Sequence, residues 1–475
     1  SAGAAMFSLT VDGIPYVYRY KDGNGTAIDF EYISGKLHKF DIEVSKKPQS
    51  GGVEFKVLGN SITAWETDNT SHDATAREYV IINVPEANPN ESALKLAIAE
   101  AGKDYTKIKN LKVTSKINEL DFYFMRDEMA VLQSINLKDV NIEGLSNSPN
   151  FDGWIPYGAF IGKSTLVRFV FPDNLVGIGD SAFSGTNLTG SLIIPAGVTH
   201  IGTSAFSSLS SLNGTLTLPS SLTYIGDTAF NGCSFVGTLN IPDTVISIGE
   251  GAFSSCRKFT GNLNLPTSLE FLGRTAFKDC ENFTGSLKIP PQITEIGDMA
   301  FNQCYGLDGD LVLHDNIQTI GAYAFSGCGF RGELNLPNSL VVISEAAFQG
   351  TNFSGLLILP DELAVIGGSA FAFCGRLTGI VEIPNGVNAI SNELFYGCSQ
   401  LEGVVLHRAI DNIGGNAFGC CYQLNSITCQ ATTPPSLESS AFDGVAKDNF
   451  TVEVPEASVM EYSTAPVWNE FKRFS

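Results

Sequence analysis

The stretch Leu239-Asn240-Ile241-Pro242, followed by Ile248-Gly249 and Ala252-Phe253, decides the fold because the same pattern recurs along the chain. The Phe returns every 23 or 24 residues, in thirteen copies if the Leu-Phe pair at 394–395 is included. These positions are Phe160, Phe183, Phe206, Phe230, Phe253, Phe277, Phe301, Phe325, Phe348, Phe371, Phe395, Phe418 and Phe442.

Spacing inside the repeat is rigid in one part and variable in another. Pro242 lies six residues before Ile248, which lies five before Phe253, and the other copies keep these intervals. All length variation falls between the Phe and the next Pro. Residues that stack on a neighbouring coil cannot slip, whereas an outer loop gains a residue cheaply. The spacing therefore predicts a solenoid of stacked coils.

Each coil can be interpreted from its residue pattern. In Gly285–Pro290 the apolar residues alternate, which predicts a short strand with Leu287 and Ile289 facing inward. Gly297 permits a turn, and the segment 298–301 is expected to form one helical turn that places Phe301 in the core. The predicted fold is a mixed α/β solenoid of 23–24-residue coils, each with one short strand and one helical turn.

The repeat resembles the BspA-like bacterial leucine-rich repeats over roughly residues 105–475. That resemblance implies a secreted or surface-attached protein that adheres to host matrix proteins or to other bacteria. The chain departs from the family pattern at single coils: His314 and His407 replace the strand-ending Pro, and Ser344 and Ser391 replace the Gly. Because of these departures, no binding surface of the family can be transferred by position.

The chain divides into four expected regions. The alternating runs before residue 88 predict a small all-β, sandwich-like domain, which resembles the BACON-type carbohydrate-associated domains. A helix is expected from Glu91 to Ala101, followed by irregular coils that cap the array. The expected regions are the β-sandwich-like domain 1–88, the helix and N-terminal capping coils 89–150, the leucine-rich repeat array 151–445 and the C-terminal cap 446–475.

Composition excludes several classes of partner. The formal net charge of -21 disfavours nucleic acid and anionic lipid, because both need clustered Lys and Arg. No run of 18 apolar residues is present, so no membrane-spanning segment is expected. The opening residues 1–5 are interpreted as a leader left after removal of a signal or lipid anchor, although a cytoplasmic chain would look the same. We expect an extracellular or cell-surface location.

Ten cysteines invite a disulfide interpretation, but their positions argue for another. Eight follow the repeat Phe by three residues, and Thr186, Leu209 and Thr351 fill that slot in other coils. A slot that accepts Cys, Leu or Thr is small and buried, so a ladder of free thiols is expected. If any disulfide forms, Cys420 and Cys429 are its expected partners, because they break the register.

No chemistry-bearing motif is found. The chain has no C-x-x-C pair, no H-x₃-H spacing, no G-x-S-x-G and no phosphate-binding loop. A hairpin turn between Tyr20 and Ile28 explains the run Asp22-Gly23-Asn24-Gly25 better than a calcium loop, because the required Gly and Glu are missing. The sequence therefore predicts no enzyme activity, no cofactor and no metal site.

The candidate binding surface lies on the strand positions that point away from the core. Leu356, Ile358, Ile380 and Val405 form an apolar cluster there. Such a cluster either contacts a partner or is covered by the chain itself, and the residues favour neither. The function hypotheses are an adhesin for a host or bacterial surface protein and, alternatively, a glycan-binding protein of a polysaccharide-using gut bacterium. The two outward rows hold no aromatic platform, which favours a protein partner on that face.

Overall fold

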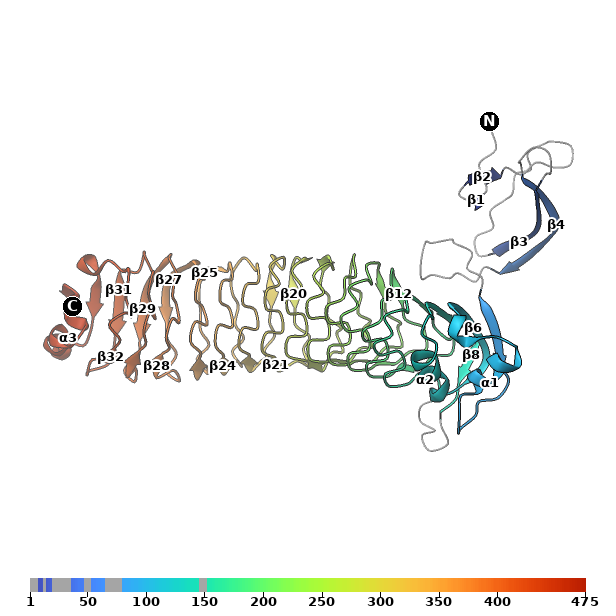
Figure 1. Ribbon diagram of the computed structural model, residues 1–475. Helices are drawn as coiled ribbons and strands as arrows, with labels where there is room; N and C mark the ends of the chain where they lie inside the picture. The colour runs from blue at the N-terminus through green and yellow to red at the C-terminus, as the bar shows by residue number, and fades with distance from the viewer. Residues whose placement is uncertain (1–6, 12–13, 19–35, 47–52, 65–78, 145–151) are drawn as a thin grey trace. The chain divides into compact units, whose positions relative to one another are not determined.

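The structure is a computed structural model that describes residues 7–11, 14–18, 36–46, 53–64, 79–144 and 152–475. The chain separates into two compact units, Ser1–Asp68 and Asn69–Ser475. Figure 1 shows the second unit as a stack of coils. The expected leader at residues 1–5 and the whole of the predicted turn between Tyr20 and Ile28 lie outside the described residues.

The first unit contains two antiparallel strand pairs. Strand β1 (Phe7–Val11) pairs with β2 (Ile14–Tyr18), and β3 (Lys36–Lys46) pairs with β4 (Val53–Ala64). These pairs do not by themselves form a sandwich, so the expected β-sandwich stays a prediction. Strand β5 (Val80–Val84), which the sequence placed in this domain, belongs to the second unit and pairs in parallel with another strand of that unit.

The second unit begins with a capping region that contains two helices (Figure 1). Asp121 is buried and joins these helices: its carboxylate accepts hydrogen bonds from the Leu94 N–H at 2.8 Å, the Ser92 hydroxyl at 2.7 Å and the Asn118 N–H at 3.0 Å. The elements are α1 (Ala93–Glu100), η1 (Tyr105–Lys107), β6 (Asn110–Ile117), α2 (Glu119–Asp127), β7 (Ser134–Asn136), β8 (Val140–Ile142) and β10 (Arg168–Val170).

The coils that follow contain two short strands each where both are formed, not the single strand predicted. We call the surface formed by the strands before the repeat Pro the first face. Its strands are β12 (Leu192–Ile193), β14 (Leu216–Thr217), β17 (Gly261–Asn262), β19 (Phe283–Thr284), β20 (Leu287–Lys288), β22 (Leu311–Val312), β25 (Ser354–Leu356), β27 (Arg376–Glu382), β29 (Leu401–Leu406) and β31 (Ser426–Cys429).

We call the surface formed by the strands that end at the repeat Ile the second face, which lies along the opposite side of the stack (Figure 1). Its strands form parallel sheets of six, four and three strands. They are β9 (Trp154–Ile155), β11 (Gly177–Ile178), β13 (His200–Ile201), β15 (Tyr224–Ile225), β16 (Ser247–Ile248), β18 (Phe271–Leu272), β21 (Glu295–Ile296), β23 (Thr319–Ile320), β24 (Val342–Ile343), β26 (Val365–Ile366), β28 (Ala389–Ile390), β30 (Asn412–Ile413) and β32 (Ser436–Leu437).

The predicted helical turn at the repeat Phe is wrong. Met299 and Gln303, on either side of Phe301, have φ angles of 56° and 62°. A right-handed helix cannot contain such residues. The N–H groups of Met299, Phe301 and Gln303 instead donate to carbonyls of the next coil, at 2.8, 2.9 and 2.8 Å. The repeats therefore build a β-solenoid in which turns, not helices, carry the Phe.

The core of the solenoid is a stack of phenylalanines. Phe301 is fully buried, and its ring lies 5.7 Å from Phe277 and 5.6 Å from Phe325, nearly parallel to both. The stack is closed at the C-terminal end by a cap whose Trp468 indole N–H donates to the Pro435 carbonyl at 2.9 Å. The cap consists of η3 (Lys447–Asn449), β33 (Thr451–Glu453), η4 (Glu456–Ser458), α3 (Val459–Thr464), η5 (Trp468–Glu470) and β34 (Arg473–Phe474).

Candidate functional site

The four predicted site residues lie on the first face, on coils near the C-terminal end. Leu356 is 48% exposed, Ile358 69% and Ile380 50%, whereas Val405 on β29 is half-buried. Within the part of the chain that the structure describes, these three side chains are therefore open to solvent. A covering segment of the same chain, which the sequence left open, is not found among the described residues.

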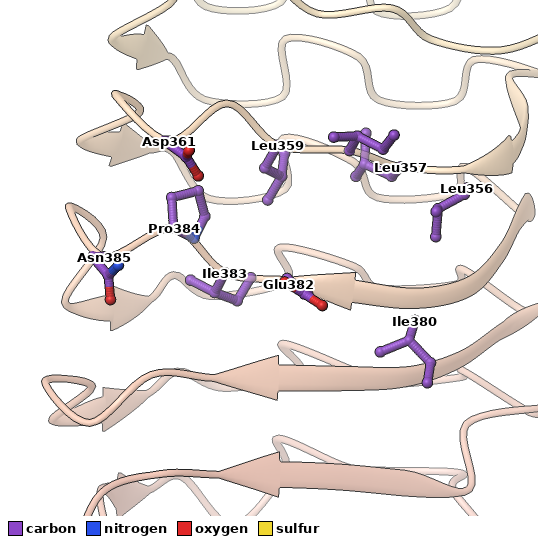
Figure 2. Close-up of a pocket in the computed structure, with 10 residues that line it drawn as sticks. Leu356, Leu357, Leu359, Asp361, Ile380, Glu382, Ile383, Pro384 and Asn385 are labelled. Carbon is purple, nitrogen blue, oxygen red and sulfur yellow. The ribbon is translucent and has the colours of Figure 1, made fainter. Parts of the chain in front are cut away.

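Leu356, Ile358 and Ile380 border a groove between two coils with a volume of about 350 Å³. Figure 2 shows Leu356 and Ile380 toward one end of the groove, with Asp361 and Asn385 toward the other. The complete lining is Leu356, Leu357, Ile358, Leu359, Asp361, Ile380, Glu382, Ile383, Pro384 and Asn385. Val405 does not belong to it.

The groove lies where two neighbouring strands change register. Leu356 of β25 pairs with Thr378 of β27, an offset of 22 residues (378 minus 356). The prolines that end the same two strand segments, Pro360 and Pro384, are 24 residues apart (384 minus 360). The pairing of β25 with β27 therefore ends at Leu356, where the groove begins.

The charged side chains that line the groove are all acidic. Asp361 and Glu382 contribute carboxylates, and the lining contains no basic side chain. Exposed leucine and isoleucine beside carboxylates can accept an apolar group that carries a positive charge near it.

A second cluster was missed by the sequence analysis, because only one strand per coil was expected. On the second face, the residue before the repeat Ile points outward, and this row contains Trp154, His200 and Tyr224. Phe271, in the same row, is 56% exposed. The signal was present in the sequence at a fixed position, one residue before each repeat Ile.

The predicted ladder of free thiols is confirmed. All ten cysteines are unpaired, including Cys420 and Cys429. Each of the eight thiols in the repeat slot donates to a Phe carbonyl of the preceding coil, for example Cys328 to Phe301 at 3.1 Å and Cys256 to Phe230 at 3.0 Å. The others are Cys233, Cys280, Cys304, Cys374, Cys398 and Cys421.

Burial makes these thiols poor nucleophiles. It raises the pKa of Cys233 to about 12 and that of Cys374 to about 11. Since the thiolate is the reactive form, these positions stabilise the coils and do not carry catalysis. The two histidines that replace the strand-ending Pro are also structural: the rings of His314 and His407 hydrogen-bond to the carbonyls of Pro290 and Val387 at 2.7 and 2.9 Å.

No metal centre is formed by the described residues: none of their His, Cys, Asp and Glu side chains gather in groups of three or more suited to a metal ion. A search for membrane spans over the same residues finds no helix long and apolar enough to cross a bilayer.

The two-faced coils and the thiol ladder define a leucine-rich-repeat solenoid. A family profile described as BspA type leucine rich repeat region (6 copies) matches residues 100–213, 133–260, 223–353, 260–378 and 318–449. The chain therefore belongs to the BspA-type leucine-rich-repeat family. A comparison with curated proteins finds no match.

Several solved structures are similar to this chain, and the first of them supports the same fold. A leucine-rich repeat protein from Bacteroides ovatus is 24% identical over 94% of this chain and 99% of its own, with a TM-score of 0.53. A leucine-rich cell surface protein from Faecalibacterium prausnitzii is 21% identical over 64% of this chain and 83% of its own, with a TM-score of 0.32. The pneumococcal vaccine antigen PcpA is 18% identical over 76% and 78%, with a TM-score of 0.39.

Proposed function

We propose that this protein is a cell-surface or secreted binding protein whose first face attaches to a surface protein of a host or of another bacterium. One observation carries the proposal: Leu356, Ile358 and Ile380 are exposed together along one groove. Isolated apolar side chains on a surface are ordinary, but a contiguous patch is typical of a contact site. Membership of the BspA-type family supports the same proposal.

A protein partner suits this face better than a sugar does. The groove lining contains aliphatic side chains and no aromatic ring, and sugars are commonly bound by stacking on aromatic rings. Its two carboxylates, Asp361 and Glu382, favour a partner segment that carries Lys or Arg next to apolar residues. Catalysis is not proposed, since the site offers no nucleophile with an activating base.

The test is the double variant Ile358→Ser with Ile380→Ser. Because both side chains are exposed, the free energy of unfolding should change by only about 0.5 kcal/mol. Binding to immobilised host matrix proteins or bacterial surface proteins, measured by biolayer interferometry, should weaken at least tenfold, which is about 1.4 kcal/mol. Val312→Ser is the matched control. Val312 is 43% exposed at the position of its own coil that corresponds to Ile358, but it lies outside the groove.

Two results contradict the proposal in different ways. A double variant that unfolds would show that the cluster is packed in solution. A folded double variant that binds its partner as the original chain does would place the contact on another surface.

A further inference from the structure

The second face carries a row of aromatic side chains near its N-terminal end. Parallel pairing of β9, β11, β13 and β15 puts Trp154, Gly177, His200 and Tyr224 opposite one another on successive coils. The next residue of each strand is the fully buried repeat Ile, for example Ile155. Since side chains alternate along a strand, Trp154, His200 and Tyr224 project outward. We call these three residues the aromatic row.

Trp154 lies flat against the sheet. A Cβ atom placed on Gly177 would come within 2.5–2.6 Å of three carbons of the indole ring. Only glycine leaves room for the indole at this position, so one face of the ring covers the backbone of β11. The Trp154 side chain as a whole is half-buried. Trp154 is the only member of the row with a glycine beside it on the next coil.

The neighbouring rings extend this surface from coil to coil. The ring centroids of Trp154 and His200 are 5.8 Å apart with planes inclined by 38°. His200 and Tyr224 repeat the arrangement, at 5.8 Å and 32°. His200 is held in place by a 2.8 Å hydrogen bond between its Nδ1 and the Thr199 hydroxyl. The three rings therefore form a continuous row along the face.

Polar groups run beside the aromatic row. Asp180 and Asp227 each use Oδ1 to accept an N–H of the next coil, from Thr203 and Glu250, both at 2.8 Å. Their Oδ2 atoms have no hydrogen-bond partner among the described residues. Partial burial raises the pKa of Tyr224, and the nearby carboxylates of Asp227 and Asp180 raise it further. The row is therefore bordered by carboxylate acceptors.

The geometry points to a carbohydrate site: we propose that Trp154, His200 and Tyr224 bind a neutral polysaccharide chain that runs along the solenoid axis. Pyranose rings present C–H groups of slight positive charge, which pack against the electron-rich faces of aromatic rings. Sugar hydroxyls can donate to Asp180 and Asp227. The same carboxylates, with the net charge of -21, repel acidic polysaccharides.

A polypeptide fits this surface less well than it fits the first face. Peptide segments are held by pockets for alternate side chains or by an open strand edge. The aromatic row offers no such pocket, because the indole lies flat on the sheet. Strands β11, β13 and β15 are paired on both sides, and only β9, at the end of the sheet, is paired on one side. The row lies on the face opposite to the groove at Leu356, so the two sites can be tested separately.

The test uses the full-length chain and affinity gel electrophoresis with soluble polysaccharides: a β-glucan, a xylan, a galactomannan and starch as neutral probes, and polygalacturonate as an acidic probe. We expect retardation by at least one neutral probe and none by polygalacturonate. Trp154→Ala and the double variant His200→Ala with Tyr224→Ala should each weaken that retardation roughly tenfold. Tyr305→Ala is the matched control, since Tyr305 is 55% exposed outside the row.

Circular dichroism melts establish whether each variant is folded. If the Trp154 variant does not fold, the double variant of His200 and Tyr224 provides the test. The proposal is overturned if no neutral probe retards the chain, if folded variants of the row bind as the original does, or if only polygalacturonate binds. Ile358→Ser with Ile380→Ser should leave polysaccharide binding unchanged. If the variant with Ile358 and Ile380 replaced loses protein binding but keeps polysaccharide binding, the result concerns the first face and not the aromatic row.

Discussion

Each repeat Phe is held by stacking on the Phe of the coil before and after it. Phe301 lies between Phe277 and Phe325, and the three rings are parallel to within 4°. The backbone turns at Met299 and Gln303 aim this side chain at the core. One residue therefore contributes to the cohesion of three successive coils.

Phe301→Ala should lower the free energy of unfolding by roughly 3–5 kcal/mol, because it removes a fully buried aromatic ring and leaves a cavity in the stack. Urea denaturation followed by circular dichroism measures the loss. Phe373→Ala is the control: that ring is 56% exposed, so its removal should change stability little. A loss below about 1 kcal/mol for Phe301→Ala would contradict the central role of the stack.

Single residues also show which features of the fold can be predicted from the sequence and which cannot. The buried Phe and Cys positions could be predicted because their spacing is constant. The left-handed position two residues before the Phe could not, since Ser181, Met299, Tyr323 and Glu393 occupy it in different coils. Glycine occupies it only at Gly158 and Gly251, so no glycine pattern marks this conformation along the array. It is maintained by hydrogen bonds to the next coil, and a helical turn was predicted in its place.

Neighbouring coils are also linked by side chains at the second face. Asp298, which follows the repeat Gly, accepts the backbone N–H of Ala322 on the next coil at 2.8 Å. Asp180, Asp227 and Asn392 make the same link in their coils. This position was interpreted from the sequence as the start of a helical turn, but the acceptor serves the next coil.

Asp298→Ala should cost about 1–2 kcal/mol in the free energy of unfolding, because the Ala322 N–H loses its acceptor. Asp298→Asn keeps an acceptor oxygen and removes only the exposed ion pair with Arg274, which contributes little. The Asn variant should therefore melt close to the original chain in calorimetry. Equal losses in both variants would mean that the charge, and not the link between coils, matters.

The thiol ladder makes stability depend on pH. Burial raises the pKa of seven repeat thiols: Cys233, Cys256, Cys280, Cys328, Cys374, Cys398 and Cys421. An unfolded thiol ionises near pH 8.5. Below that pH both states are protonated and the contribution of the ladder is complete. Above it only the unfolded chain ionises, so the free energy of unfolding falls as pH rises.

Denaturant melts between pH 7 and pH 10, under reducing conditions, should show this decline, with each buried thiol contributing up to about 1.4 kcal/mol per pH unit above 8.5. Replacing Cys233, Cys374 and Cys421 by Ala should make the decline shallower, even though the variant starts less stable. An unchanged slope would assign the alkaline loss to other groups.

The second strand of each coil also escaped prediction, for a physical reason. Strands such as β13 (His200–Ile201) and β15 (Tyr224–Ile225) are two residues long. Alternation of apolar and polar residues can be recognised only over at least four residues. The outward residue before each Ile was therefore not recognised as part of a sheet. The aromatic row was missed with it, whereas the exposed apolar cluster could be found because the longer pattern before each Pro alternates visibly.

At the scale of the whole second unit, the solenoid has two long faces of different chemistry. The first face carries an aliphatic groove with carboxylates, and the second carries aromatic rings at its N-terminal end. We infer that one stack of coils can carry both kinds of surface, because the outward residues of each face vary without disturbing the Phe core. The two proposed sites differ in ligand class for this reason.

A stack of coils must also be closed at its ends, because an open end exposes both core and strand edges. At the C-terminal end Trp468 is buried, donates to the Pro435 carbonyl and packs against Tyr462 with ring centroids 5.1 Å apart. Tyr462 in turn donates to the Ala431 carbonyl at 2.8 Å. These two side chains fasten the cap to the last coils.

Trp468→Ala should therefore release the cap, with a loss of about 3–5 kcal/mol and exposure of the edge of β31. Exposed strand edges pair with other chains, so the variant should form larger species in size-exclusion chromatography with light scattering. Trp154→Ala is the matched control, because it removes an outward indole from the second face and leaves both ends closed. If the Trp468 variant elutes and melts like the original chain, the array does not depend on this cap, and its last coil must be stable with an open edge.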